Sequence, residues 1–431
     1  MDTRQFDIVL FGATGFTGQF VATHLLSKGP ETLRIALAGR SLSKLEQARD
    51  TIASRVPREC TARVAQTALL VADSSDQESL DAMAASTRVL LSTAGPFVRL
   101  GVPVVQACLK NRTHYVDSTG EGLFIRKLIE QFHEEAVRTG VRIVPSCGFD
   151  SIPSDLGALV YLSISIRSLS FDMLGKKTDS VRCVVTDIKG GASGGTIHSI
   201  IGIAETASIQ DLLTYQYWLN SDKPEDVKSR PDPGYPVLFR YNRDLSRYET
   251  AWFMEVTNTP YVRRTWELLS KQYGTQFKYI ESMGLFSNFI LALGCALGII
   301  GMFLGLGLPP VRWLVKKLVP AGSGPSVKAC ENGRVESRFV AIAEDGMKAF
   351  GIFKMDKDAG YAGTAILLSE SAICLALDEA VLKGNKAEDV GPFGVLEGGV
   401  LTAASAMGMV IVKRLRAQGI QLEVIESKSE K

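Results

Sequence analysis

Short apolar runs alternate with longer segments of helical periodicity over residues 1–150. Each run is continuous rather than alternating, which is typical of strands that are buried on both faces of a parallel sheet. The intervening segments, the first two at residues 15–27 and 43–55, are long enough to form crossover helices. The predicted strands cover residues 7–12, 34–39, 67–71, 88–93, 113–117 and 141–145. This alternation predicts a complete doubly wound α/β domain over residues 1–150.

The chain after residue 150 has a less regular pattern, which predicts an α+β domain with a mixed sheet over residues 151–400. Residues 336–344 and 348–356 alternate apolar and polar positions around an Asp-Gly turn, and this arrangement predicts a β-hairpin. Further predicted elements are helices from Ser154 to Leu162, over 361–381 and over 402–417, and a strand over 421–425. We expect the last helix and strand, within residues 401–431, to pack on the first domain.

One stretch of 30 residues, 282–311, contains no charged side chain, whereas Arg312, Lys316 and Lys317 follow it closely. Its length exceeds the roughly 20 apolar residues that are needed to span a bilayer. Three interpretations stay open: a helix that crosses a membrane, a monotopic hairpin or interfacial segment bent at its glycine-rich middle, and a buried helix pair of the core or of a dimer. A helix that crosses the membrane would place the predicted hairpin and the first domain on opposite sides of it, so we favour the interfacial segment. We therefore expect the protein at the cytosolic face of a membrane or at a lipid-droplet surface, and a homodimer stays open.

The composition argues against several classes of protein. With 48 Lys and Arg against 46 Asp and Glu, the formal charge is only +2, so no concentrated basic face for nucleic acid is expected. The seven cysteines include no C-x-x-C and the four histidines no H-E-x-x-H, so neither a disulfide framework nor a metal site is expected. The N-terminus lacks a charged segment followed by an apolar one, so we expect no secretory leader. The odd number and scattered positions of the cysteines favour a reducing compartment.

Three glycines stand where the first predicted strand turns into the first helix, in the sequence GATGFTG at residues 12–18. Glycines at this junction allow a tight turn and the close approach of backbone N–H groups to a pyrophosphate. The N-terminus of the helix adds the positive end of its dipole. The alternative is a purely structural turn, which rarely needs three glycines. We therefore predict a Rossmann dinucleotide site, with cofactor contacts from Gly12, Thr14, Gly15, Phe16, Thr17 and Gly18.

The second predicted strand ends in the sequence AGRS at residues 38–41, with Lys44 one helical turn later. A site specific for NAD would place Asp or Glu here to bind the ribose hydroxyls. Arg40 can instead pair with a 2′-phosphate, and Ser41 and Lys44 supply further donors, so we predict NADP(H) as the cofactor. The alternative is that Arg40 is only a solvated residue at a strand end. By position in the fold, the residues near the adenine and beside the nicotinamide half are expected to be Asp73 and then Ala94 and Gly95.

Six motifs carry a resemblance: FGATGFTGQF (11–20), AGRS (38–41), AGPF (94–97), YVDSTGE (115–121), GFDSIPSDLG (148–157) and VRRT (262–265). Together they resemble the saccharopine dehydrogenase-like oxidoreductases, and more narrowly the branch of the eukaryotic saccharopine dehydrogenase-like protein and the trans-acting enoyl reductases. The resemblance implies a Rossmann domain, a second domain bearing the substrate, and a nicotinamide cofactor. The family's cofactor-binding positions match Gly12, Gly15, Gly18, Arg40 and Ser41. A short-chain dehydrogenase is not expected, because no tyrosine is followed by lysine four residues later.

Side chains that can donate a proton lie at the end of the predicted fifth strand and just after it, and they are Tyr115, Asp117 and Glu121. Hydride transfer to C=C, C=N or C=O builds negative charge that a donor must neutralise, so we predict these three as catalytic candidates. The alternative is that the two acids cap a helix that starts near Gly122, where the helix dipole favours them. Residues 146–157 are expected to form a wall of the cleft. The glycine-rich run 189–196 is either a cradle for part of the substrate or a flexible connection.

The predicted function is the NADPH-dependent reduction of an apolar acyl or lipid-like substrate, as in a trans-acting enoyl reductase. The NADP-type motifs and the uncharged segment motivate this prediction. One alternative is a saccharopine-type imine reductase or dehydrogenase that acts on an amino-acid adduct, for which Arg99, Arg263 and Arg264 could bind carboxylates. The other is a non-catalytic membrane or lipid-droplet protein with a nucleotide site.

Overall fold

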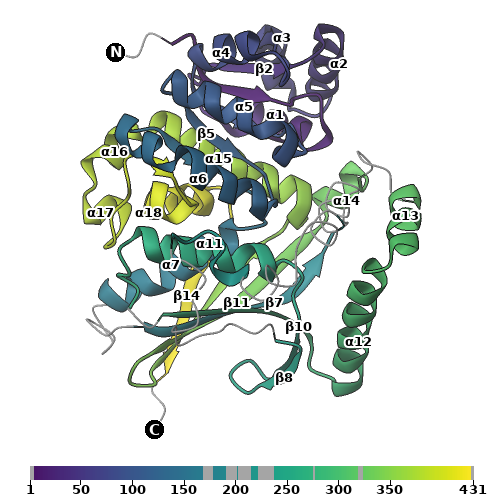
Figure 1. Cartoon of the computed structure of the whole chain (residues 1–431), viewed down its shortest axis with the longest axis vertical. Helices are drawn as coiled ribbons and strands as arrows, with labels where there is room; N and C mark the ends of the chain where they lie inside the picture. The colour runs from purple at the N-terminus through teal and green to yellow at the C-terminus, as the bar shows by residue number, and fades with distance from the viewer. Residues whose placement is uncertain are drawn as a thin grey trace. The chain divides into compact units, whose positions relative to one another are not determined.

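The computed structural model describes residues 4–167, 178–190, 201, 215–221, 237–274, 277–318 and 324–428. Most of the glycine-rich run at 189–196 therefore lies outside the described residues. The chain forms two compact units, whose elements are labelled in Figure 1. The first unit comprises Met1–Ile152 and Tyr361–Gln418, and the second comprises Pro153–Gly360 and Gly419–Lys431.

The first unit is built on a 7-stranded parallel sheet with the strand order β13-β6-β5-β4-β1-β2-β3. The strand order reverses between β3 and β4, which is the topology of a doubly wound fold. The predicted fold class is thus confirmed, although β13 is too short to produce an apolar run. The strands are β1 (Phe6–Phe11), β2 (Ile35–Gly39), β3 (Ala68–Val71), β4 (Thr87–Ser92), β5 (His114–Asp117), β6 (Arg142–Val144) and β13 (Gly399–Val400).

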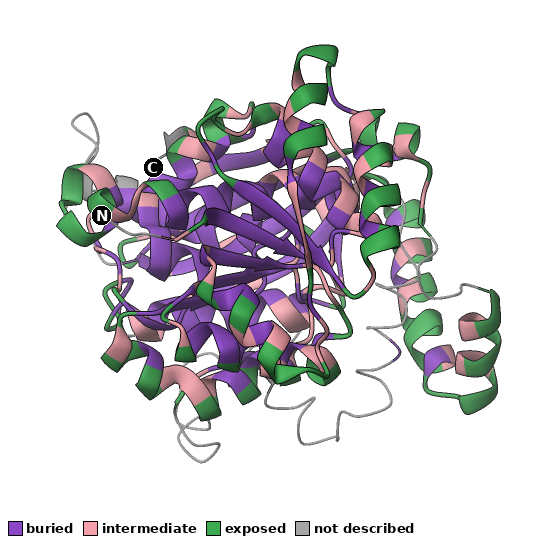
Figure 2. Cartoon of the chain, turned by 90° about the horizontal axis from the view of Figure 1, so that it is seen from above, coloured by how far each residue is buried: buried purple, intermediate pink, exposed green. Residues whose placement is uncertain are grey.

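Helices cover both faces of this sheet, so its strands are largely buried, except for the edge strand β3 (Figure 2). In one layer α1 packs against α2 and α15, and α15 packs against α18. In the other layer α5 packs against α4 and α6. The helices are α1 (Phe16–Lys28), α2 (Leu42–Ala53), α3 (Thr61–Gln66), α4 (Gln77–Ala85), α5 (Phe97–Lys110), α6 (Gly122–Thr139), α15 (Thr364–Leu377), α16 (Glu379–Gly384), α17 (Ala387–Val390) and α18 (Ala403–Ala417).

The second unit contains a 7-stranded sheet with the order β14-β12-β11-β7-β10-β9-β8. Among the described strands β7 and β10 pair in parallel and the other neighbours are antiparallel, so the predicted mixed sheet is confirmed. β11 and β12 form the predicted hairpin. The strands are β7 (Thr178–Lys189), β8 (Phe239–Asn242), β9 (Arg247–Thr250), β10 (Lys278–Phe286), β11 (Arg334–Ala343), β12 (Lys348–Met355) and β14 (Gln421–Lys428). The helices are α7 (Ile152–Arg167), α11 (Glu255–Leu268), α12 (Phe289–Leu306), α13 (Pro309–Leu318) and α14 (Val327–Glu331).

The first helix of the second unit starts earlier than predicted. The Ile152 N–H already donates to the Gly148 carbonyl at 3.1 Å, so helical hydrogen bonding begins before Ser154. Ser154 therefore lies inside α7 and does not cap it. Its hydroxyl instead donates to the Glu281 carboxylate at 2.9 Å, and this contact links α7 to β10.

The two units differ from the predicted domains in two places. Residues 361–400, which we assigned to the second domain, belong to the first unit, where α15 packs on α1 and β4. The final strand, β14, pairs with β12 in the second sheet, so its expected packing on the first domain is wrong. The connections between the units lie close to residues 152, 360 and 418, where the apolar pattern carries no signal.

The uncharged stretch is divided between three elements. Its first residues complete β10, where Ser282 and Met283 are buried. α12 then runs without interruption through the glycine-rich middle, so the bend predicted at these glycines is wrong. A glycine inside a helix costs only about 1 kcal/mol, so single glycines within an apolar segment do not end the helix. The chain turns instead at Gly307 and Leu308, after which α13 begins.

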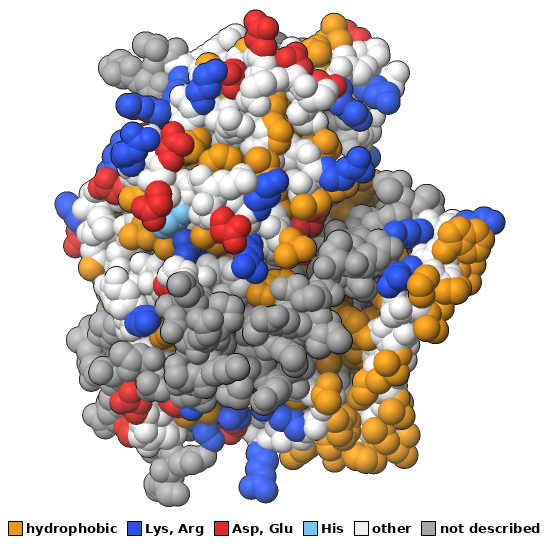
Figure 3. Space-filling view, viewed as in Figure 1, with side chains coloured by type: hydrophobic (Ala, Val, Ile, Leu, Met, Phe, Trp, Pro, Cys, Tyr) orange, Lys and Arg blue, Asp and Glu red, His pale blue; other side chains and the backbone are white. Residues whose placement is uncertain are grey.

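Two described helices are long and apolar enough to cross a membrane. Ala359–Leu377, with a mean hydropathy of 1.4, is 78% buried and is a core helix of the first unit. Phe289–Leu306 has a mean hydropathy of 2.5 but is only 17% buried. Its apolar side chains gather on the surface over α12 and α13 (Figure 3), so the predicted buried helix pair is not formed within this chain.

Candidate cofactor and active site

The glycine loop after β1 is shaped by contacts that exclude side chains. Gly12 has a φ of +90°, and a Cβ there would lie 2.8 Å from the Ala94 nitrogen and 2.9 Å from Thr93 Oγ1. A Cβ at Gly18 would overlap the Gly12 carbonyl oxygen, so α1 can approach the loop only because residue 18 is glycine. The loop, the start of α1 and the loop after β4 are thereby packed backbone against backbone.

The N-terminus of α1 provides backbone donors for an anion. Gly15 is the N-cap residue, and it has no side chain to accept from the first turn. Its own N–H donates to the Gly12 carbonyl at 3.0 Å. The next three N–H groups have no partner within the helix, as in every α-helix. They carry the positive end of the helix dipole, which favours a bound phosphate. The Phe16 ring packs edge-on against Phe20 and Tyr361 at 5.3 and 4.9 Å, so its backbone is well fixed.

The end of β2 presents cations beside the loop after β3. Arg40 and Lys44 are exposed, and the Ser41 hydroxyl caps α2 by accepting from the Lys44 N–H at 3.5 Å. Asp73 accepts from the Ser75 N–H and hydroxyl at 2.9 and 2.8 Å. These hydrogen bonds, with a smaller contribution from the Arg40 charge, hold the pKa of Asp73 below its usual value. This arrangement suits a 2′-phosphate, which Arg40 and the exposed lysine would bind.

The two side chains predicted at the end of β5 are fully buried. The Tyr115 hydroxyl donates to Asp117 Oδ2 at 2.8 Å, and the N–H groups of Thr119 and Ser146 donate to Oδ1 at 2.9 and 2.8 Å. Burial raises the pKa of Asp117 to about 7, despite these three donors. Asp117 therefore ties β5 to the loop after β6. Its role and that of Tyr115 as proton donors stay predictions, and the hydrogen bonds favour a structural role.

Glu121 binds a different helix from the one expected. Its carboxylate accepts from the N–H groups of Phe97 and Val98 at 3.0 and 2.8 Å, which lie at the start of α5. It makes no capping hydrogen bond at the start of α6, and Asp117 makes none either. The interpretation that both acids cap the helix near Gly122 is therefore wrong. The positive end of a helix dipole does favour the Glu121 carboxylate, but the helix is α5 and not the helix that follows Glu121 in the sequence.

Asp150 is a further acidic side chain at this edge of the sheet, and it is not among the predicted catalytic residues. It follows β6 within the motif of residues 148–157, and its carboxyl lies against Gly120 in the loop after β5. Its side chain is half-buried, and it makes no hydrogen bond or ion pair with the described part of the chain. Burial raises the pKa of Asp150 to about 6. Asp117, Glu121 and Asp150 thus all follow neighbouring strands, but only the last carries an unengaged carboxyl.

Comparisons with known proteins identify the family. Residues 8–144 match the family described as the saccharopine dehydrogenase NADP binding domain. A Mycobacterium tuberculosis protein named as a candidate trans-acting enoyl reductase is 37% identical over 435 residues, which cover 97% of each chain. The trans-acting enoyl reductase of Mycobacterium ulcerans is 35% identical over 436 residues, with the same coverage. This chain belongs to the saccharopine dehydrogenase-like family.

The family assignment confirms the resemblance and the predicted cofactor. The first unit of this saccharopine dehydrogenase-like protein is an NADP-binding domain, and the chain is an NADP-dependent oxidoreductase. Among solved structures, apo saccharopine dehydrogenase (L-Glu forming) from Saccharomyces cerevisiae is similar, with a TM-score of 0.48 and 14% identity. That similarity covers 98% of this chain and 100% of the yeast chain.

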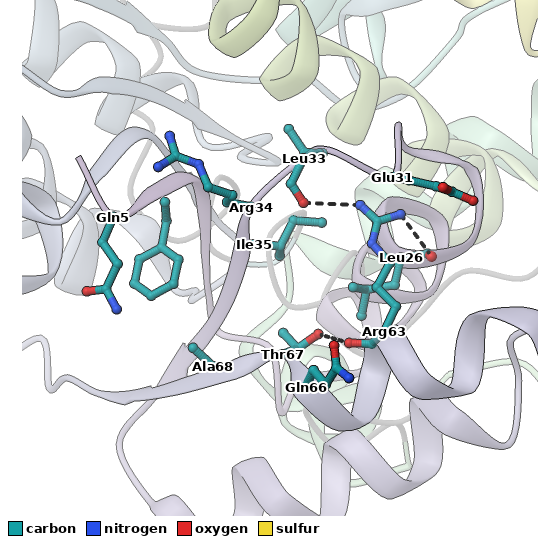
Figure 4. Close-up of a pocket in the computed structure, with 11 residues that line it drawn as sticks. Gln5, Leu26, Glu31, Leu33, Arg34, Ile35, Arg63, Gln66, Thr67 and Ala68 are labelled. Carbon is teal, nitrogen blue, oxygen red and sulfur yellow. Dashed lines mark hydrogen bonds between the residues drawn. The ribbon is translucent and has the colours of Figure 1, made fainter. Parts of the chain in front are cut away.

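A depression of about 270 Å³ in this saccharopine dehydrogenase-like chain lies at the amino ends of the strands of the first sheet, opposite the edge that carries the glycine loop (Figure 4). It is bordered by Phe6, Ile35 and Ala68, at the amino ends of β1, β2 and β3. Arg63 in its wall donates to the carbonyls of Gly29 and Pro30 at 2.9 and 2.6 Å, and so stabilises the connection after α1. Ligands of open α/β sheets bind at the carboxyl ends of the strands, so this depression is not the cofactor site.

The second unit also contains a buried carboxyl, Glu281 on β10. It accepts from Ser154, Asn258 and Tyr279 at 2.9, 2.7 and 2.9 Å, and burial raises its pKa to about 7. Like Asp117, this side chain is fully engaged. Within the described ranges, no group of three or more His, Cys, Asp or Glu residues could hold a metal ion.

Proposed function

We propose that this protein uses NADPH to reduce the C=C bond of an α,β-unsaturated acyl thioester that carries an apolar chain. The observation that carries the proposal is the match along 97% of both chains to relatives named trans-acting enoyl reductases. A match that continues through the second unit supports a shared substrate class more strongly than a match of the cofactor domain alone.

The residues of the first unit fit the cofactor that this reaction requires. Gly12 and Gly18 allow the loop and α1 to pack closely, the N-terminus of α1 would offer backbone N–H groups to a pyrophosphate, and Arg40 would bind the 2′-phosphate. When bound, NADPH supplies the hydride, which forms a C–H bond at the β-carbon while the π electrons move toward the thioester carbonyl. The α-carbon then requires a proton from the protein or from water.

The alternative imine substrate is less well supported, because two of the three arginines predicted to bind carboxylates are buried. Arg264 is buried and donates to Glu267 at 2.9 Å. Arg263 is also buried, and its guanidinium lies 4.2 Å from the centre of the Tyr217 ring. Arg99 on α5 is exposed. A substrate with several carboxylates needs accessible guanidinium groups, and Arg263 and Arg264 do not provide them.

The proposal includes a membrane or lipid surface as the place of action. α12 exposes its apolar side chains to solvent, and α13 adds Trp313, which is 64% exposed. Lys317 lies 5.2 Å from the centre of the Trp313 ring, and Lys316 precedes it. An apolar helix followed by an amphipathic one with Trp and Lys is typical of segments that lie in the interface of a bilayer. The exposed large apolar side chains of the two helices are Phe289, Ile290, Leu291, Leu293, Leu297, Ile300, Met302, Phe303, Leu304, Trp313, Leu314 and Leu318.

The sheet of the second unit argues against a single membrane crossing. β10 precedes α12 and β11 follows α13, and both strands pair with β7, one on each side. A helix that crossed a bilayer once would leave β10 and β11 on opposite sides, which their common neighbour does not allow. The segment must therefore return to the side from which it leaves, as an interfacial or re-entrant segment does.

The substrate class is tested by a cofactor-oxidation screen of the full chain. NADPH and NADH are each offered with enoyl thioesters of increasing chain length and with imine adducts of amino acids. We expect NADPH oxidation with the enoyl thioesters and a kcat/KM that rises with chain length. Oxidation with the imine adducts alone would replace the enoyl proposal, and binding of NADPH without any turnover would favour a non-catalytic nucleotide site.

Membrane association is tested by flotation with vesicles of phosphatidylcholine and phosphatidylserine. The test variant replaces Ile290, Leu297 and Leu304 by Glu, since these side chains are 76%, 60% and 71% exposed. The matched control is Leu42→Glu, at a 48% exposed position of the first unit. We expect the wild type and the control to float and the triple variant to stay in the lower fraction. Equal flotation of all three would contradict the proposal.

A further inference from the structure

The loop after β6 brings Asp150 to the edge at which a cofactor lies. β4, β5 and β6 are neighbours in the first sheet, and the loops that follow them are at its carboxyl edge. The glycine loop follows β1, on the other side of β4. In a doubly wound fold the pyrophosphate lies at that loop and the nicotinamide half extends over the strands that continue past the switch point. Asp150 is therefore on the nicotinamide side of the sheet.

The backbone that carries Asp150 is held at several points. Ser146 has a φ of +62°, which is uncommon for a side chain other than glycine, and its N–H donates to Asp117 Oδ1 at 2.8 Å. Its hydroxyl lies 2.9 Å from that of Ser151, so the two ends of the turn are joined. The Phe149 N–H donates to Thr364 Oγ1 at 3.1 Å. These contacts hold the backbone around Asp150 in place, and the Asp150 side chain makes none of them.

The Asp150 carboxyl is partly shielded from water, and it pairs with no side chain of the described ranges. A Cβ at Gly120 would lie 2.9 Å from Asp150 Oδ2, so the carboxyl packs closely against the backbone of residue 120. The acidic groups on the neighbouring loop are Asp117 and Glu121, and both are held by N–H donors. Burial is what raises the pKa of Asp150 to about 6. A half-buried carboxyl with a raised pKa, held at the carboxyl edge of the sheet without a partner in the described ranges, is suited to a role with a bound substrate.

We propose that Asp150 is the catalytic proton donor of the reduction, and this inference rests on the proposed function. As the hydride forms the C–H bond at the β-carbon, the O–H bond of the Asp150 carboxylic acid breaks and its proton forms the second new C–H bond at the α-carbon. The electrons of that O–H bond stay on the Asp150 carboxylate, which takes up a proton from solvent before the next cycle. Tyr115 and Asp117 do not compete for this role, because both are completely buried and bonded to each other.

The kinetic test uses Asp150→Asn, with Asp50→Asn at an exposed position of α2 as the matched control. General acid catalysis typically contributes on the order of 10²–10⁴-fold, so we expect kcat of Asp150→Asn to fall by that factor while its Kd for NADPH is unchanged. The wild-type kcat should fall as the pH rises through about 6, where the acid loses its proton, and this limb should vanish in the variant. Asp150→Glu should restore part of the rate. A kcat for Asp150→Asn within a factor of 3 or so of the control would overturn the inference.

A second readout does not depend on turnover. In protein labelled with ¹³C at the aspartate carboxyls, the resonance that disappears in Asp150→Asn should titrate near pH 6, and an ordinary midpoint near 4 would overturn the inference. The two proposals can fail separately. If the wild type oxidises no NADPH with any enoyl thioester, the proposed function fails and the proton donation falls with it. If the wild type turns over and Asp150→Asn turns over equally well, the assignment of Asp150 alone is lost.

Discussion

The two ends of the carboxyl edge of the first sheet hold charge in different ways. After β2 and β3, Arg40 and Lys44 are exposed and the hydrogen bonds of Ser75 lower the pKa of Asp73. After β5 and β6, Asp117 and Asp150 are withdrawn from water, and burial raises their pKa values to about 7 and 6. Solvated charges can pair with a phosphate, whereas a desolvated carboxyl can keep a proton near neutral pH. The first end is suited to recognition of the cofactor and the second to proton chemistry.

The second end itself contains two kinds of carboxyl, which mutation should separate most clearly. Asp117→Ala removes the acceptor of Tyr115, Thr119 and Ser146, and leaves three buried donors without a partner. We expect a loss of about 3 kcal/mol or more in the free energy of unfolding. Asp150→Ala removes no hydrogen bond and should cost less than about 1 kcal/mol. Urea unfolding at pH 7 measures both values, and equal losses would break the distinction between the two carboxyls.

At the first end, Arg40→Ala should reduce the preference for NADPH. A charge-assisted contact with a phosphate contributes roughly 1.5–3 kcal/mol, so we expect the Kd for NADPH to rise roughly 10- to 100-fold. The Kd for NADH should be unchanged, because NADH has no 2′-phosphate. Isothermal titration calorimetry of both cofactors measures this difference, with Arg126→Ala on the exposed face of α6 as the control. A parallel loss for NADH would show that Arg40 acts on the adenosine rather than on the phosphate.

Asp117 should also make the free energy of unfolding depend on pH. The pKa of Asp117 is about 7 in the folded state and close to 3.8 in the unfolded state, so the folded chain binds its proton more tightly. This group therefore makes its full contribution to stability below about pH 4 and loses it as the pH rises toward 7. Asp117→Asn does not titrate, so the stability gap between wild type and variant should narrow from pH 5 to pH 7. A gap that widens over this range would mean that Asp117 is charged in the folded protein.

Much of the fold could be predicted because it depends on local pattern. The continuous apolar runs located β1 to β6, and the Asp-Gly turn located the hairpin of β11 and β12. β13 could not be predicted, because its two residues form a strand only by pairing with Arg142 and Ile143 of β6. The assignment of α15 to the first unit likewise depends on contacts with segments far away in sequence, such as the 3.2 Å contact between His24 and Glu370.

The residues of the cofactor site could be predicted from sequence more easily than the catalytic side chains. Glycines at positions 12 and 18 are dictated by steric contacts within one local motif, so their spacing carried the signal. Glu121 could not be placed from sequence, since it binds N–H groups 23 and 24 residues away, at the start of α5. Asp150 was overlooked for a related reason: what distinguishes it is the lack of a partner in the described structure, and only the folded chain reveals which acids have partners.

The most direct test of the central claim follows hydride into an acyl product. The full-length protein is incubated with a long-chain enoyl thioester and NADPH that carries deuterium at the transferring position of C4, and the acyl product is analysed by mass spectrometry. We predict a saturated thioester with one deuterium, located on the β-carbon. Recovery of the unsaturated thioester without label, from protein that binds NADPH, would contradict the account.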